Sequence, residues 1–291
     1  CWNASGDMRY IMGGDWDDPS HLFFIPFAAS PFDRSEGNGF RCVKYLSPES
    51  FPAFAAEPMA LPFARNFEKE TPVSDDGFAF FKRLYAYDRR ELNAVVESAD
   101  DGSPSWRKEK IAYDAAYGGE RVIAYLYLPK VGAAPYQTVI YFPGSNAVNL
   151  RSSADLGTGH FDYLVKSGRA VLYPVYKSTY ERGDGFNFEP AQLTPNNWRD
   201  HAILWSKDFA RSIDYLETRP DVDADRLAYL GYSWGAHQGV ILLGLEKRIR
   251  AGIFLVGGFV PSESLKAVPE ADHINFAARI TIPSLMLNGR F

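Results

Sequence analysis

The segment that most constrains the fold is the run Gly231-Tyr232-Ser233-Trp234-Gly235, a Gly-x-Ser-x-Gly motif. A short apolar run at 227–230 precedes it, and small and apolar residues at 236–245 follow it. This order predicts a buried strand, a sharp turn at the serine and then a helix. Flanking glycines let the strand and the helix approach each other, so the hydroxyl stands at the carboxyl end of the strand. The setting favours a nucleophilic serine over a purely structural turn.

Strand and helix patterns alternate through most of the chain, which predicts a mostly parallel, doubly wound α/β sheet. Three strands come first and are expected to be antiparallel, because a turn at Gly118-Gly119 separates the last two of them. We expect strands at 92–97, 107–113, 121–128, 138–142, 170–175, 227–230, 251–256 and 284–287. We expect helices at 75–85 with Ser74 as cap, 155–167 closed by Gly168, 196–218 and 236–245.

Composition excludes several classes of function. The net charge is −5 with both signs interspersed, so no basic patch suggests nucleic acid as a partner. The two cysteines, Cys1 and Cys42, provide neither a disulfide framework nor a metal-binding spacing. No apolar run reaches the ~18 residues that span a membrane, and no signal peptide is recognisable. We therefore expect no cofactor, no metal and no membrane span in this chain, and a cytoplasmic location is favoured.

Three regions are expected along the chain: an irregular segment at 1–46, a proline-rich linker at 47–72 and an α/β domain at 73–291. The first region resembles the C-terminal end of a formylglycine-generating-enzyme (sulfatase-modifying factor) domain, in its segments Arg9–Trp16 and Asn38–Val43. That family's active members carry a cysteine pair that 17–23 lacks here, so oxidase activity is not expected. A start at Cys1 suggests a piece of a longer protein.

Residues from about 71 onward resemble an α/β-hydrolase of the dienelactone-hydrolase, acetyl-xylan-esterase and prolyl-oligopeptidase grouping. They resemble more closely the esterase-like modules of bacterial multidomain proteins that also carry a serine/threonine kinase domain. The segments that carry this resemblance are 136–145, 198–201 and 282–290. It implies an α/β-hydrolase fold that is incomplete at its C-terminus, a small-molecule ester as substrate and a covalently linked kinase domain in the full-length protein.

The resemblance also implies roles for individual residues. Ser233 attacks an ester carbonyl, and two backbone N–H groups hold the oxyanion. One N–H belongs to Trp234, and the other to Ser145, with Asn146 as the second choice. Tyr232 and Asn146 are expected to contact the substrate.

The family's triad runs Ser, then Asp or Glu, then His along the chain. The acid is expected just past the strand at 284–287, near Asn288-Gly289, and the histidine later still. Neither is found before Phe291, so we expect this chain by itself to be inactive. Histidines already present are weak substitutes: we expect His237 to pack beneath the site and His201 to lie on a helix surface beside Asp200. The others are His160 and His273, without a carboxylate pattern, and His21 in the first region.

Two sets of acidic residues need a functional and a structural interpretation. Asp221, Asp223 and Asp225 could bind a metal, but they lack the glycine and distal glutamate of a calcium loop, so a polar turn is favoured. Glu181 and Asp184, in the long loop at 176–195, could touch a substrate, although a solvated loop is favoured.

Three hypotheses remain for the function. The first is a serine hydrolase acting on carboxylic esters. The second is a peptidase of the prolyl-oligopeptidase kind, ranked lower because no propeller-like repeat precedes the domain. The third is a non-catalytic regulatory or binding module of a kinase-linked protein. For the chain as given, we also expect an exposed apolar edge near 284–287.

Overall fold

The structure is a computed structural model that describes residues 4–5, 8–11, 13–14, 27–39, 65–189, 191–258 and 268–288. The chain divides into two units, 1–64 and 65–291, and the division lies inside the predicted linker. In the first unit, β1 (Ala4–Ser5), β2 (Met8–Ile11) and β3 (Phe27–Ala29) form a small antiparallel sheet. Most of the predicted linker and the segment 40–43 lie outside the described residues.

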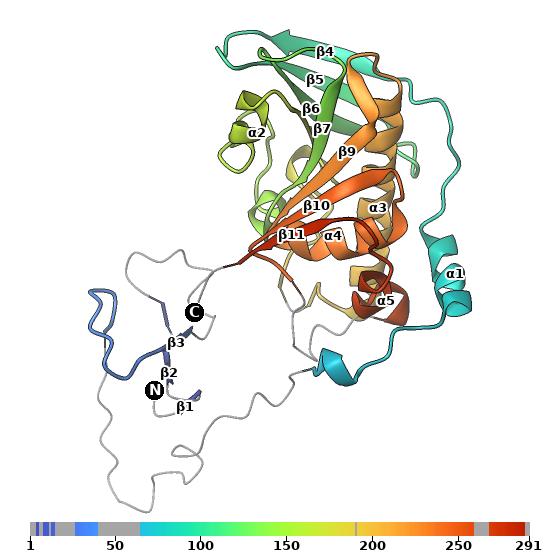
Figure 1. The fold of residues 1–291 in the computed structure, drawn as a ribbon. Helices are drawn as coiled ribbons and strands as arrows, with labels where there is room; N and C mark the ends of the chain where they lie inside the picture. Colours follow the sequence, from blue (N-terminus) through green and yellow to red (C-terminus); the bar gives the residue numbers. More distant parts are fainter. Residues whose placement is uncertain are drawn as a thin grey trace, which may run out of the picture. The chain divides into compact units, whose positions relative to one another are not determined.

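The second unit is built on one eight-stranded sheet with the order β11-β10-β9-β7-β8-β6-β5-β4 (Figure 1). Its first three strands are antiparallel: β4 (Val95–Asp100), β5 (Trp106–Asp114) and β6 (Arg121–Pro129). The parallel strands are β7 (Tyr136–Phe142), β8 (Ala170–Pro174), β9 (Val222–Tyr232), β10 (Ile249–Leu255) and β11 (Ser284–Leu287). The predicted mostly parallel α/β architecture is confirmed.

Five α-helices are found in the described part of the second unit: α1 (Asp75–Leu84), α2 (Asp162–Lys166), α3 (Pro195–Glu217), α4 (Trp234–Leu245) and α5 (Ile274–Ala277). Short 3₁₀ helices are η4 (Phe67–Lys69), η5 (Ser145–Val148), η6 (Tyr180–Arg182) and η8 (Pro269–Ala271). Ser74 caps α1 as expected, since its side chain accepts a hydrogen bond from the Gly77 N–H. None of the described helices combines the length and apolar character needed to cross a bilayer.

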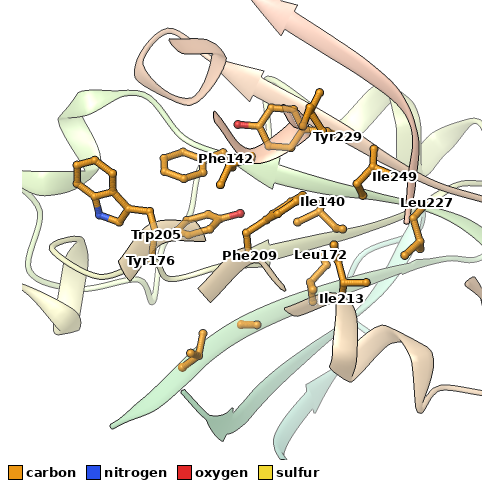
Figure 2. Close-up of a cluster of buried hydrophobic side chains, with 14 of the residues drawn as sticks. Ile140, Phe142, Leu172, Tyr176, Trp205, Phe209, Ile213, Leu227, Tyr229 and Ile249 are labelled. Atoms are coloured by element: carbon orange, nitrogen blue, oxygen red, sulfur yellow. The ribbon is translucent and has the colours of Figure 1, made fainter. Parts of the chain in front are cut away.

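The central strands are apolar on both faces because helices cover both faces. Successive residues of a strand point to opposite sides, so Ile140 and Phe142 of β7 join one core cluster, and Val139 and Tyr141 join the other. The first cluster contains side chains of α3 and α4, and the second contains side chains of α2. Figure 2 shows part of the first cluster, including Leu172, Tyr176, Trp205, Phe209, Ile213, Leu227, Tyr229 and Ile249.

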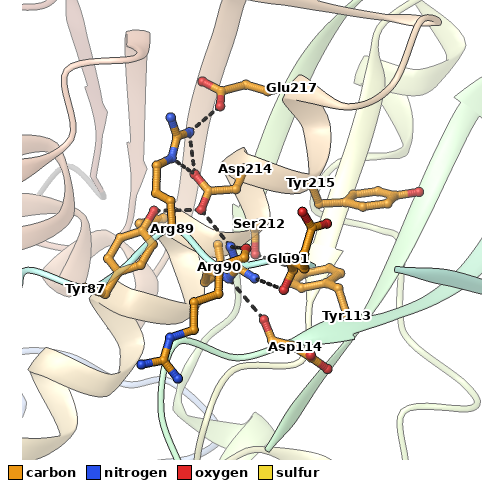
Figure 3. A network of polar contacts seen from close by, with 12 residues as sticks. Tyr87, Arg89, Arg90, Glu91, Tyr113, Asp114, Ser212, Asp214, Tyr215 and Glu217 are labelled. Carbon is orange, nitrogen blue, oxygen red and sulfur yellow. Dashed lines mark hydrogen bonds and ion pairs between the residues drawn. The ribbon is translucent and has the colours of Figure 1, made fainter. Parts of the chain in front are cut away.

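A polar network fastens residues 87–91 to α3 (Figure 3). The buried carboxylate of Asp214 accepts hydrogen bonds from Arg89 (2.6 Å), Tyr87 (2.9 Å) and Arg248 (2.7 Å). Arg211, also buried, donates to the backbone carbonyls of Arg90, Glu91 and Asp114. Burial acts to raise the pKa of Asp214, but these donors lower it, so the carboxylate stays charged. It therefore fastens residues 87–91, which lead into β4, to α3.

Two predicted elements differ from the structure. The helix predicted at 155–167 is wrong, because only 162–166 is helical. Gly157 and Gly159 interrupt the segment, and each glycine disfavours a helix by about 1 kcal/mol relative to alanine. The strand predicted at 92–97 instead covers 95–100 and is exposed along its whole length. The predicted exposed edge is confirmed: β11 ends the sheet, and Leu285, Met286 and Leu287 are 51%, 57% and 48% exposed.

Candidate active site

Ser233 lies at the junction of β9 and α4 in a backbone conformation that residues other than glycine seldom adopt. Its φ is 52° and its ψ is −109°, and it immediately precedes the first residue of α4. Its N–H donates to the Leu255 carbonyl on the neighbouring strand β10 (2.8 Å). Strain of this kind, of order 1–3 kcal/mol, persists where the surroundings hold it, and it collects at functional sites. The predicted strand, sharp turn and helix are therefore all present.

The two glycines of the motif are required by close backbone contacts. A Cβ on Gly231 would lie 2.5 Å from the carbonyl carbon and oxygen of Gly235. A Cβ on Gly235 would lie 2.2 Å from the carbonyl oxygen of Phe142, at the end of β7. No larger residue fits either position without a backbone shift. Strand β9, helix α4 and the end of β7 thus converge on the serine.

The backbone donors expected to hold an oxyanion come from two elements that meet at Ser233. Trp234 is the first residue of α4, where N–H groups have no partner within the helix. The next N–H, that of Gly235, is already bonded to the Pro143 carbonyl (3.0 Å), and this bond ties the loop after β7 to the elbow. A Cβ built on Gly144 would lie 3.6 Å from the Cβ of Ser233, so this loop passes directly beside the serine.

Ser145 and Asn146 follow in the same loop as the first two residues of η5. They precede the first backbone bond of that turn, which Ala147 makes with Gly144 (3.2 Å). Asn146 is exposed and Ser145 is half-buried, so both can be reached from the solvent. The structure thus brings the predicted donor segment and the predicted nucleophile together.

Tyr232 forms one wall beside the nucleophile. Its ring lies about 3.0 Å from the position that a Cβ on Gly144 would take. On its other side it stacks against His160, with ring centroids 3.9 Å apart. His160 is exposed, and its Nδ1 lies 3.3 Å from the Tyr141 hydroxyl. The sequence indicated Tyr232 but not its contact with His160, because no motif marks that histidine and the two residues are far apart in the chain.

His237 lies one helical turn beyond the nucleophile, is partly buried, and packs against the buried His273 of the α5 cap. Their ring centroids are 3.7 Å apart, and Nδ1 of His237 donates to the Gly258 carbonyl (3.0 Å). Burial lowers the pKa of both rings, and for His273 the neighbouring His237 lowers it further. Both rings are therefore neutral at pH 7. The contact of His237 with Gly258 agrees with the packing role expected for it.

His201, expected on a helix surface beside Asp200, lies in α3 and contacts the long loop. Asp200 accepts from Arg199, while the His201 ring contacts Asp184 (Nε2 to Oδ2, 3.2 Å) and the Asn197 carbonyl (2.8 Å). Partial burial works to raise the pKa of Asp184, but hydrogen bonds from His201, Phe186 and Ser178 lower it to about 2. The pair joins the long loop to α3. None of the histidine contacts given above involves the Ser233 hydroxyl.

The remaining acidic candidates have structural partners. Asp221 directly precedes strand β9 and pairs with Arg219 (2.7 Å). The predicted polar turn is wrong for Asp223 and Asp225, because both lie inside β9. Asp223 pairs with Arg226 and accepts a hydrogen bond from the Asp225 N–H (3.1 Å). Glu181 accepts a hydrogen bond from the Ser153 N–H (2.8 Å). Among the described residues, no group of three or more His, Cys, Asp or Glu side chains is placed to hold a metal ion.

Comparison with known proteins identifies the fold but no family. No family model matches this chain, and no curated protein matches it. An acetyl xylan esterase from Paenibacillus sp. R4 is 18% identical with a TM-score of 0.53, covering 75% of this chain and 80% of that one. Acetyl xylan esterase 1 from Thermoanaerobacterium sp. JW/SL YS485 is 16% identical with a TM-score of 0.55, covering 77% and 80%. The chain has an α/β-hydrolase fold. At these identities the likeness extends to the fold alone.

Proposed function

We propose that this chain carries the nucleophile and the oxyanion-binding groups of a serine esterase. The observation that supports this best is the strained Ser233, held at the β9–α4 junction with the Gly144–Ser145 loop against it. In the proposed reaction, the Ser233 hydroxyl oxygen attacks an ester carbonyl while its proton passes to a histidine. The alcohol then leaves with that proton, and water hydrolyses the acyl-enzyme.

The oxyanion would be held by the backbone N–H groups of Trp234 and Ser145, with Asn146 as the alternative to Ser145. Loss of one such donor typically costs about 3 kcal/mol of transition-state stabilisation. Tyr232, which adjoins the serine, and Asn146, two residues after Gly144 in the neighbouring loop, would contact the substrate, a small-molecule ester. No metal or cofactor enters this scheme.

The scheme needs a general base and an acid that the described residues do not bring to Ser233. His201 contacts Asp184, and His160 contacts Tyr141 and Tyr232, while His237 contacts Gly258. For this reason a non-catalytic regulatory module is the second candidate. We propose further that residues 1–46 derive from a formylglycine-enzyme-like domain, that the whole protein carries a kinase domain, and that it resides in the cytoplasm.

Ester hydrolysis tests the proposal. The longest natural protein that contains this chain should hydrolyse 4-nitrophenyl acetate, and Ser233→Ala should remove the activity by at least about 10³-fold, as for other triad serines. Ser98→Ala, on the exposed strand β4 at the far edge of the sheet, is the matched control and should retain activity. Undiminished hydrolysis in Ser233→Ala overturns the assignment. Complete inactivity of the wild type toward both esters and proline-containing amides favours the regulatory module.

A further inference from the structure

A cavity of about 460 Å³ lies at the C-terminal end of η5, the short helix that begins with Ser145 and Asn146. One wall is the end of η5 and the residues after it, Val148, Asn149 and Arg151. The other wall is the part of the β8–α3 loop between residues 178 and 187. A 3₁₀ helix rises about 2 Å per residue, so Asn149 lies roughly 8 Å along the chain from the oxyanion donor Ser145. This volume and position suit part of a substrate held at Ser233.

The loop wall is held in one conformation. The buried carboxylate of Asp208 accepts hydrogen bonds from the Tyr117 hydroxyl (2.9 Å) and the Lys177 N–H (2.8 Å), and it pairs with Arg182, which also is buried. Ser178 and Tyr180 have positive φ values of 72° and 49°. Strained residues fixed by a buried ion pair make a preformed wall, since the loop cannot relax without breaking the pair.

Arg151 is the one cationic side chain among the described residues that line this cavity. Its Nη1 donates to the carbonyls of Val148 (2.9 Å) and Leu150 (3.3 Å). The same nitrogen lies 3.7 Å from the position of a Cβ on Gly183, so the guanidinium reaches the opposite wall. Within the described residues, its hydrogen bonds go to carbonyl oxygens and none to a carboxylate. Glu181 also lines the cavity, but one of its oxygens is bonded to the Ser153 N–H (2.8 Å).

We propose that the Arg151 cavity binds a carboxylate on the substrate, so that this site takes anionic esters such as half-esters of short dicarboxylic acids. The inference rests on the proposed function, because it places the ester carbonyl at Ser233 and the free carboxylate at Arg151. Guanidinium groups bind carboxylates through charge-assisted hydrogen bonds, and a preformed wall lowers the ordering cost of binding. Glu181 opposes the bound anion and sets an upper limit to its affinity.

Binding to the inactive Ser233→Ala variant tests this without turnover. Calorimetry should show monomethyl glutarate, an anion at pH 7, binding at least about tenfold more tightly than neutral dimethyl glutarate. Arg151→Gln should reduce that ratio to near one, and Arg151→Lys should retain part of it. Arg169→Gln removes an exposed arginine that contacts Ser167, and it should leave the ratio unchanged.

A second variant keeps the test valid if Arg151→Gln disturbs the loop. Glu181→Gln keeps an acceptor for the Ser153 N–H and removes the opposing charge, so monomethyl glutarate should bind a few-fold more tightly. Equal binding of the two glutarates, or no effect of Glu181→Gln, overturns the inference. Ester hydrolysis that depends on Ser233 but shows no preference for anionic esters overturns the proposed role of the Arg151 cavity and leaves the proposed esterase function standing. An anion preference without hydrolysis overturns the proposed esterase alone.

Discussion

Ser233 and its two flanking glycines show how single residues fix the geometry of the site. The serine accepts a positive φ because Gly231 and Gly235 let β9, α4 and the end of β7 approach within normal contact distance. These roles could be inferred from the sequence, because the Gly-x-Ser-x-Gly spacing reports a local steric requirement. The approach of the Gly144 loop was expected only through the family resemblance. Residue spacing alone could not indicate it, since that contact joins residues about ninety positions apart.

Substitution of Gly235 tests the steric account. Gly235→Ala places a methyl group 2.2 Å from the Phe142 carbonyl oxygen, so backbone must move and we expect a loss of about 2–4 kcal/mol in unfolding free energy. Urea denaturation measures this. Gly159→Ala, where nothing lies within 4 Å, should change stability by no more than about 0.5 kcal/mol. An equal effect of the two substitutions contradicts the steric account.

The pair His237 and His273 makes stability depend on pH. Both pKa values are lowered in the folded protein, chiefly by burial, so the unfolded chain takes up protons first as the pH falls below about 6.5. The contribution of this pair to the free energy of unfolding should therefore be complete above pH 7. It should decline between pH 6.5 and 5, by at most about 1.4 kcal/mol per pH unit for each ring.

Urea unfolding at pH 8, 7, 6 and 5 measures that decline. His273→Gln should reduce the slope below pH 6.5. A slope that is the same in His273→Gln and wild type would show that other groups cause the pH dependence.

At the scale of elements, prediction from the sequence worked where one face or both faces of an element are buried. The strands around 138–142 and 170–174 read as continuous apolar runs because helices cover both sides. The helix at 155–167 was predicted as a segment closed by Gly168, and two glycines inside it restrict the helix to 162–166. The link between His201 of α3 and Asp184 could not be predicted, because Asp184 lies in an irregular loop where no periodicity indicates which side chains meet.

The β8–α3 loop depends on the ion pair between Arg182 and Asp208. Arg182→Ala leaves a fully buried carboxylate without its cation, so we expect a loss of about 3–5 kcal/mol in unfolding free energy. Arg226→Ala breaks an exposed pair with Asp223 and should cost at most about 1 kcal/mol. Thermal and urea unfolding measure both losses. A small loss for Arg182→Ala would mean that the loop is held by its other contacts.

For the whole molecule, the exposed apolar edge at β11 is the main expected liability. Strand β11 ends the sheet with three half-exposed apolar side chains, and exposed edges of this kind favour association between chains. The 291-residue chain should therefore associate at high concentration, as measured by light scattering. Met286→Lys, which places a charge on this edge, should reduce the association. A monodisperse wild-type chain would contradict this expectation.

The central claim is that Ser233 is the nucleophile, and covalent labelling tests it most directly. A fluorophosphonate probe, applied to the longest natural protein containing this chain, should form an adduct on the tryptic peptide 227–247, whose one serine is Ser233. Mass spectrometry should find the adduct there, and Ser233→Ala should abolish it. A hydrolytically active protein that carries the adduct on another residue, or none, would contradict the account.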